Sequence, residues 1–237
     1  DWMPEIFGTR EPERWSPMEQ AAGKGFTGLP LGNIGVQYGL TLLQQGRITP
    51  AQFVDLNAKI GGLDVDIGPV PQRVSADRPA IANAYRSGTI NMTNNMSTVA
   101  IINFLGPDPG IAHDSVHAFW VRWRLDREQG HHDNHVMWAG PIPVLSDLND
   151  VHNGLTAMDR WLSAVEQDHS DATLAQKIVY NKPDDIHDQC TDGLGHVLLP
   201  AECLKLIEPI YAYGTPRTVA GGDVTSDDLD CHLKPLN

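Results

Sequence analysis

The chain alternates strand-like and helix-like segments between residues 98 and 167, and this alternation constrains its fold more than any other feature. Residues 98–105 form a continuous run of apolar and β-branched side chains, typical of a strand buried on both faces. A loop rich in Gly and Pro at 106–110 leads to a helical pattern over 115–129. A second strand at 135–138 and a second helical pattern over 154–167 follow. This order predicts parallel strands flanked by helices, which is an α/β fold.

Both predicted helices carry apolar side chains at helical spacing. The first is preceded by Asp114 as a cap and is ended by Gly130. Its expected apolar face comprises Val116, Phe119, Trp120 and Trp123, and that of the second helix comprises Leu155, Met158, Leu162 and Val165. We therefore expect each helix to pack on the sheet through this face.

The flanking regions lack this alternation. Residues 1–90 are rich in Pro and Gly and contain only short helical patterns, at 36–43, 50–60 and 78–87. We predict that they form a helical and loop segment that acts as an insertion or lid. Residues 91–170 would form the α/β core, and residues 171–237 would form an irregular tail with at most one short helix near 201–207.

Two titratable residues stand where open parallel sheets gather their catalytic groups, just beyond the carboxyl ends of the strands. Asp108 follows the first strand, and His152 is expected in the loop before the last helix. An acid after one strand and a histidine after the next is the order of the C-terminal half of an α/β-hydrolase. There the histidine acts as the base and the carboxylate orients it. Asp114 and His117 are the alternatives for these roles.

The nucleophile of such a site is missing from the sequence. No Gly-x-Ser-x-Gly motif occurs, and no serine stands in a strand-to-helix turn flanked by glycines. A hydrolase interpretation therefore predicts that the nucleophilic serine lies on another chain, N-terminal to this one, in a processed, two-chain protein.

Two other functions remain open at this point. His131, His132 and His135 are spaced closely enough to suggest a metallohydrolase, although they fall in a turn between a helix and a strand. The chain would otherwise be a non-catalytic binding subunit whose histidines are ordinary surface residues. The favoured serine mechanism requires no cofactor and no metal.

The cysteines, the net charge and the lengths of the apolar runs limit which partners and which cellular location the protein can have. Cys190 and Cys203 enclose a loop rich in Gly and Asp, which suits a disulfide and leaves Cys231 over, although three reduced thiols are the alternative. The net charge of −13 argues against nucleic acid as a partner. No apolar run reaches the length of a membrane span.

Several phrases of the sequence resemble those of a bacterial exported family that is classed as a domain of unknown function. They lie at residues 35–40, 52–62, 116–117, 122–125, 133–136, 157–162 and 231–236, in order along nearly the whole chain. Members of that family look like large α/β-hydrolases, distantly similar to tannase/feruloyl esterase and to 3-hydroxybutyrate-oligomer hydrolase.

The resemblance implies a secreted or periplasmic hydrolase for ester or, less favoured, amide bonds. This chain would be its C-terminal part, and a preceding part would carry the nucleophilic serine. Tannase-like enzymes also join a cysteine beside the serine to one beside the histidine. His152 has no neighbouring cysteine, so this device does not transfer.

Overall fold

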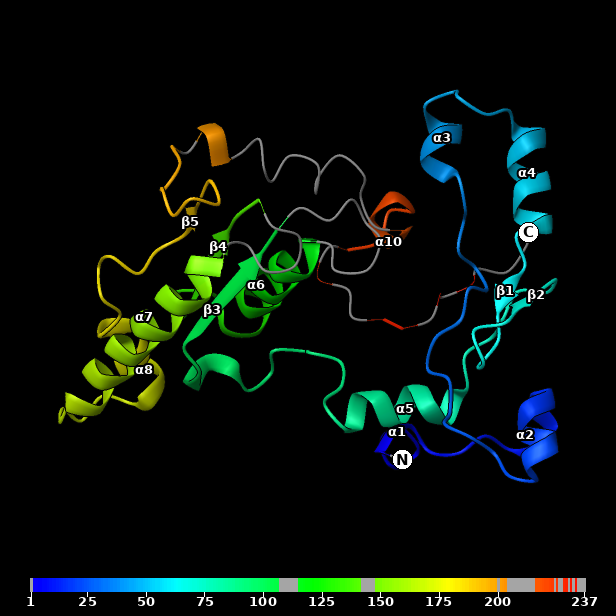
Figure 1. Cartoon of the computed structure of the whole chain (residues 1–237), viewed down its shortest axis with the longest axis horizontal. Helices are drawn as coiled ribbons and strands as arrows, with labels where there is room; N and C mark the ends of the chain where they lie inside the picture. The colour runs from blue at the N-terminus through cyan, green and yellow to red at the C-terminus, as the bar shows by residue number, and fades with distance from the viewer. Residues whose placement is uncertain are drawn as a thin grey trace. The chain divides into compact units, whose positions relative to one another are not determined.

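The computed structural model describes residues 2–106, 115–141, 148–199, 201–203 and 216–223, and the single positions 225, 228, 229, 231 and 233. The chain divides into two compact units, each of which is described by itself. Unit 1 contains Asp1–Asn91 and Thr215–Asn237, and unit 2 contains Met92–Gly214. Their helices and strands are labelled in Figure 1.

Unit 2 is built on a sheet of three parallel strands. They are β3 (Ile101–Leu105), β4 (His135–Ala139) and β5 (Gln189–Cys190), in the spatial order β3-β4-β5. Ile101 pairs with His135 and Leu105 with Ala139, so the two longer strands are in register along their whole length. The parallel pairing of the two predicted strands is confirmed.

Helices cover both faces of this sheet, as Figure 1 shows. They are α6 (Val116–Gln129) on one face, and α7 (Leu148–Gln167) and α8 (Leu174–Tyr180) on the other. Successive side chains of β4 point to opposite faces of the sheet. Met137 packs with the α6 side chains, and Trp138 packs with those of α7 and α8. A short 3₁₀ helix, η2 (Met96–Thr98), leads into β3.

Helix α7 differs from the expected helix in its start and in its buried face. It begins at Leu148 instead of at Gly154. The side chains that pack on the sheet are Ala157, Trp161 and Val165. Leu155 and Leu162, expected inside, are 71% and 43% exposed. The large indole of Trp161, fully buried beside small neighbours, determines the inward face of the helix.

Gly154 allows α7 to approach β3 closely. A Cβ atom at this position would lie 2.4 Å from Cζ of Phe104. Gly154→Val should therefore destabilise the protein by about 1–3 kcal/mol through overpacking. Urea unfolding followed by tryptophan fluorescence measures this cost. Thr156→Val, at an exposed site of the same helix, is the control. Adding Phe104→Ala should recover part of the loss, and an unchanged cost in that background would contradict the contact as its cause.

The segment expected to be an irregular tail contains regular structure. Helix α8 begins with a capping box, in which the Thr173 hydroxyl accepts a hydrogen bond from the Gln176 N–H and the Gln176 side chain accepts one from the Thr173 N–H. The Trp161 indole N–H donates to the Ile178 carbonyl at 2.8 Å, which fixes α8 on α7. The helix has too few residues to give a clear periodic pattern, and its cap was the signal that could have revealed it.

Unit 1 consists of short elements joined by long connections. They are α1 (Trp2–Phe7), η1 (Pro12–Arg14), α2 (Pro17–Ala22), α3 (Leu40–Gln44), α4 (Pro50–Lys59), β1 (Gly62–Leu63), β2 (Pro69–Val70), α5 (Arg78–Arg86) and α10 (Pro216–Val219). The helices expected from Pro50 and Arg78 are confirmed. Of the apolar side chains in the stretch from Pro50, Leu56 and Ile60 are 37% and 44% exposed.

Buried carboxylates stabilise the connections of unit 1 where apolar side chains are few. Glu19 is fully buried and accepts hydrogen bonds from the backbone N–H groups of Ser16 and Phe26, both at 2.7 Å. Asp77 accepts one from the Leu29 N–H and forms an ion pair with Arg14.

Among the described residues, no helix combines the length and the apolar composition that crossing a bilayer requires.

Candidate active site at the carboxyl ends of the strands

The carboxyl ends of β3, β4 and β5 form one edge of the sheet because the three strands are parallel. This edge is where open α/β sheets bind ligands. The backbone continues the ladder past the ends of the strands, with hydrogen bonds from the Gly140 N–H to the Leu105 carbonyl and from the Thr191 N–H to the Ala139 carbonyl. The residues just after the strands are therefore held firmly in place.

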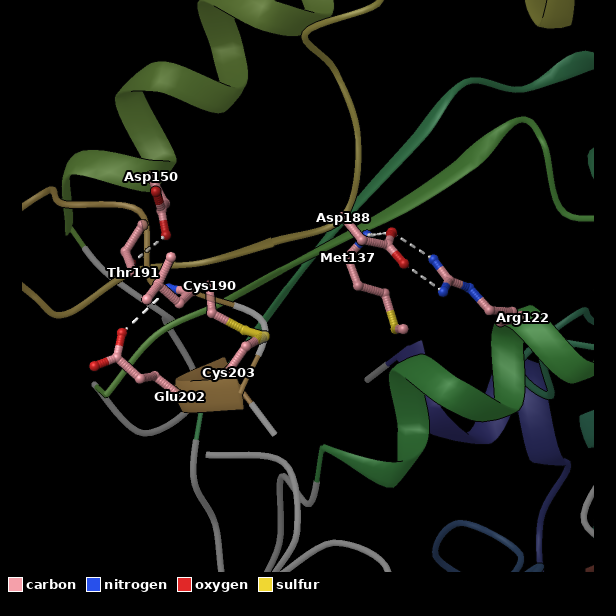
Figure 2. Close-up of a disulfide and its surroundings, with 9 residues drawn as sticks. Arg122, Met137, Asp150, Asp188, Cys190, Thr191, Glu202 and Cys203 are labelled. Atoms are coloured by element: carbon pink, nitrogen blue, oxygen red, sulfur yellow. Dashed lines mark hydrogen bonds and ion pairs between the residues drawn. A yellow bond between two sulfur atoms is a disulfide. The ribbon is translucent and has the colours of Figure 1, made fainter. Parts of the chain in front are cut away.

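A buried carboxylate fixes the start of α7 to this edge. Asp150 is 1% exposed and accepts a hydrogen bond at 3.0 Å from the hydroxyl of Thr191, the residue that follows β5 (Figure 2). It lies in the first turn of α7, at the positive end of the helix dipole. The start of the helix is thereby tied to the residue that follows β5.

A hydrogen-bonded acid and histidine stand on the tight hairpin that follows β5. Oδ2 of Asp192 lies 2.8 Å from Nδ1 of His196. Oδ1 of Asp192 accepts from the backbone N–H groups of Leu194 and His196 at 2.8 and 3.1 Å. The hydrogen bond with His196, helped by that from Leu194, lowers the pKa of Asp192 below its ordinary value. Asp192 is thus an ionised acceptor that can hold the imidazole in one tautomer and stabilise its protonated form.

The hairpin itself is joined to the sheet. Thr191 forms an antiparallel bridge with Val197, and the Leu198 N–H donates to the Cys190 carbonyl at 2.8 Å. Figure 2 also shows the Cys190–Cys203 disulfide, which spans 5.4 Å between its Cα atoms. This confirms the predicted pairing. Cys231 takes no part in that bond.

The two predicted site residues that the structure describes, His152 and His117, lie on helices that cover opposite faces of the sheet. Asp108 and Asp114 lie outside the described residues. His152 occupies an exposed position within α7 instead of the expected loop, two residues from Asp150 and two from Gly154. Since those two face the sheet, helical geometry puts His152 on the opposite side of the helix. His117 lies in the first turn of α6, on the other face of the sheet, with its ring 4.6 Å from that of Trp120.

The histidines of the metal alternative make separate contacts. His131 lies near Asp133, and His132 is hydrogen-bonded to Asp126 at 2.8 Å. His135 is buried in β4. Among the described residues, no three His, Cys, Asp or Glu side chains are placed to hold a metal ion.

His135 instead belongs to a partly buried polar network that joins α6 to the sheet. Its Nδ1 accepts from Nε of Arg122 at 3.3 Å, so its Nε2 carries the proton and donates to Oδ1 of Asn103 at 2.9 Å. Arg122 also forms a two-pronged ion pair with Asp188, at 2.6 and 2.7 Å (Figure 2). Burial, and next the positive charge of Arg122, lower the pKa of His135 from 6.5 to about 3.

Asp188 completes this network. Partial burial acts to raise the pKa of its carboxyl, but hydrogen bonds from Arg122 and from the Met137 N–H hold the pKa below the ordinary value. An ionised Asp188 therefore balances the charge of Arg122 beside the neutral His135. The network connects α6, β3, β4 and the residue before β5.

Sequence reasoning missed the Asp150–Thr191 and Asp192–His196 pairs. Strand β5 has only two residues, so the sequence contains no apolar run that would predict it. The available signal was the Asp-Gly-Leu-Gly-His turn at 192–196, a tight turn with an acid and a histidine at its ends.

Comparison with known proteins assigns the chain to a family. Residues 1–237 match a tannase-like family of unknown function (DUF6351). No curated protein and no solved structure matches the chain. Because the match spans the whole sequence, as the resemblance of its phrases predicted, the chain belongs to this tannase-like family of unknown function.

Proposed function

We propose that this chain supplies the proton-relay part of an esterase that cleaves carboxylic esters by acyl transfer. The observation that carries the proposal is the Asp192–His196 pair beyond the carboxyl end of β5. Membership of a tannase-like family, which suggests an esterase-type hydrolase, supports it. Amide bonds are the less favoured substrate.

In the proposed mechanism, His196 is the base and Asp192 orients it. With Nδ1 held by Asp192, Nε2 takes the proton of a serine hydroxyl as that oxygen attacks the ester carbonyl carbon. The protonated imidazole then gives the proton to the departing alkoxide, which leaves as an alcohol. Water repeats the two steps and releases the carboxylic acid and the serine.

His152 with Asp108, the pair predicted from the sequence, is the second candidate for the same roles. What favours His152 is its helix, because the first turn of α7 is fixed to this edge through Asp150 and Thr191. Both histidines are exposed, and His196 is favoured because its Nδ1 lies at hydrogen-bond distance from the Asp192 carboxylate.

We further propose that the serine comes from a companion polypeptide that adds to the open side of the sheet. Within the described residues, β3 bonds to a neighbouring strand only on its β4 side. Ile101, Ile102 and Phe104 remain partly exposed there. Such an edge is a ready template for another strand. The disulfide fits an oxidising location, secreted or periplasmic.

Labelling of the native full-length protein with a fluorophosphonate probe tests this function, because the probe reacts with activated serines. We expect labelling and hydrolysis of p-nitrophenyl acetate, with hydrolysis abolished once labelling is complete. A denatured sample is the control. An unlabelled and inactive protein would indicate a binding subunit. Turnover that a chelator abolishes, in a protein that the probe does not label, would indicate a metallohydrolase instead. Intact mass with and without reductant reveals a companion chain.

A further inference from the structure

An apolar cavity lies on the α6 side of the sheet, at the same edge as the Asp192–His196 pair. It encloses about 510 Å³, within the range of small-molecule pockets. The last residues of the three strands contribute to its wall together with α6 and the hairpin: Leu105, Ala139, Cys190, Phe119, Val197 and Leu198. The cavity has no role in the mechanism proposed above, which uses only residues of the hairpin.

We infer that this cavity is the acyl-binding pocket and that it takes an apolar acyl chain. The inference rests on the proposed function and extends it to a substrate class. Leu105, Phe119 and Met137 offer only carbon and sulfur to an occupant. Each methylene group that moves from water into such surroundings raises the binding affinity roughly fourfold.

The carboxylate in the wall does not call for a charged ligand. Asp188 lines the cavity, but its carboxylate is already held by Arg122 and by the Met137 N–H. A positively charged occupant would therefore gain little from it, and a negatively charged one would be repelled. This leaves the uncharged, apolar part of a substrate as the occupant.

The hairpin connects the pocket to the proposed base. Val197 and Leu198, which line the cavity, directly follow His196 in the chain. The Thr191–Val197 bridge and the Leu198 N–H bond to Cys190 fix these residues on β5. The Cys190–Cys203 disulfide forms another part of the wall. We place the ester carbonyl at His196, which does not itself line the cavity, and the acyl chain inside the cavity.

Acyl-chain selectivity of variants at Leu198 tests the inference in the full-length protein. The measurement is kcat/KM for p-nitrophenyl esters from acetate to dodecanoate. The wild type should prefer octanoate. Leu198→Phe, which fills the cavity, should lower the octanoate-to-acetate ratio by about tenfold or more, whereas Leu198→Ala should move the optimum to longer chains. Leu199→Phe, the same change at a neighbouring side chain that is 69% exposed, should keep the wild-type ratio.

Binding of octanamide and acetamide, measured by saturation-transfer NMR, separates the pocket from the chemistry. We expect octanamide to bind more tightly than acetamide, and Leu198→Phe but not Leu199→Phe to weaken octanamide by about tenfold. Equal affinities for the two amides, or ester turnover without chain-length preference, would overturn the pocket and leave the esterase proposal standing. Octanamide binding without any ester turnover would support the pocket and overturn the esterase proposal. If Leu198→Phe fails to fold, the Leu198→Ala optimum decides the question.

Discussion

Replacement of His196 by alanine should lower kcat for p-nitrophenyl ester hydrolysis by about 10³-fold or more, with little change in KM. The reason is that the imidazole acts in the transition state, where it takes and returns the serine proton, and contributes little to ground-state binding. Steady-state kinetics of the full-length protein measure the effect.

His152→Ala and His169→Ala are the matched controls for this result. Both histidines are exposed, and neither is hydrogen-bonded to Asp192. We expect both variants to keep near wild-type turnover. If His152→Ala loses activity and His196→Ala keeps it, the base is the histidine predicted from the sequence, and the hairpin pair is a surface contact.

The Asp192→Asn variant tests the partner of His196 in the same assay. An amide in place of the carboxylate can no longer stabilise the protonated imidazole, so the apparent pKa of the base in the kcat/KM profile should fall along with kcat. A merely structural role of Asp192 would reduce the amount of folded protein and leave the pKa of that profile unchanged.

The parallel core was predictable because its segments are long and regular. The β-branched run before Gly106 and the helix that ends at Gly130 each repeat one pattern over enough residues to identify the element. For α7 the pattern was misleading, because leucines at helical spacing lie outside while Gly154 and Ala157 face the sheet. Small residues at a close helix–sheet contact leave no hydrophobic signal.

The candidate site was harder to predict, since it depends on contacts between residues far apart in the sequence. Asp150 reaches Thr191, a pairing that neither local sequence suggests. Asp192 and His196 are close in sequence, but their place at the strand ends depends on β5, whose two residues pair with Trp138 and Ala139 of β4, far earlier in the chain. His135 shows the converse. It looked like a turn residue and a metal candidate, and packing made it a buried neutral side chain.

His135 should make the stability of the protein fall as the solution becomes acidic. Its pKa is about 3 in the folded chain and near 6.5 when unfolded. Between these two values the unfolded state binds the extra proton, so stability is complete above pH 6.5 and is lost as the pH falls towards 3. At 1.36 kcal/mol per pKa unit, the loss is about 2 kcal/mol at pH 5 and about 4 kcal/mol at pH 3.

The groups around His135 explain why it resists protonation. A second proton would go to Nδ1, which already accepts from Arg122, and would add a positive charge beside that guanidinium. Asp188 compensates only part of this, since it is engaged with Arg122. Urea unfolding at pH 7 and pH 5 of the wild type and of His135→Gln isolates the effect. The variant should lose about 2 kcal/mol less than the wild type over this interval.

His131→Gln serves as the matched control, because this histidine is 43% exposed and lies in the connection just before β4. Its acid sensitivity should equal that of the wild type. An unchanged loss between pH 7 and pH 5 in His135→Gln would mean that another group controls the acid response. In that case the hydrogen bonds of His135 to Arg122 and Asn103 would not keep it neutral in solution. A histidine that is charged in both the folded and the unfolded state does not make the stability depend on pH.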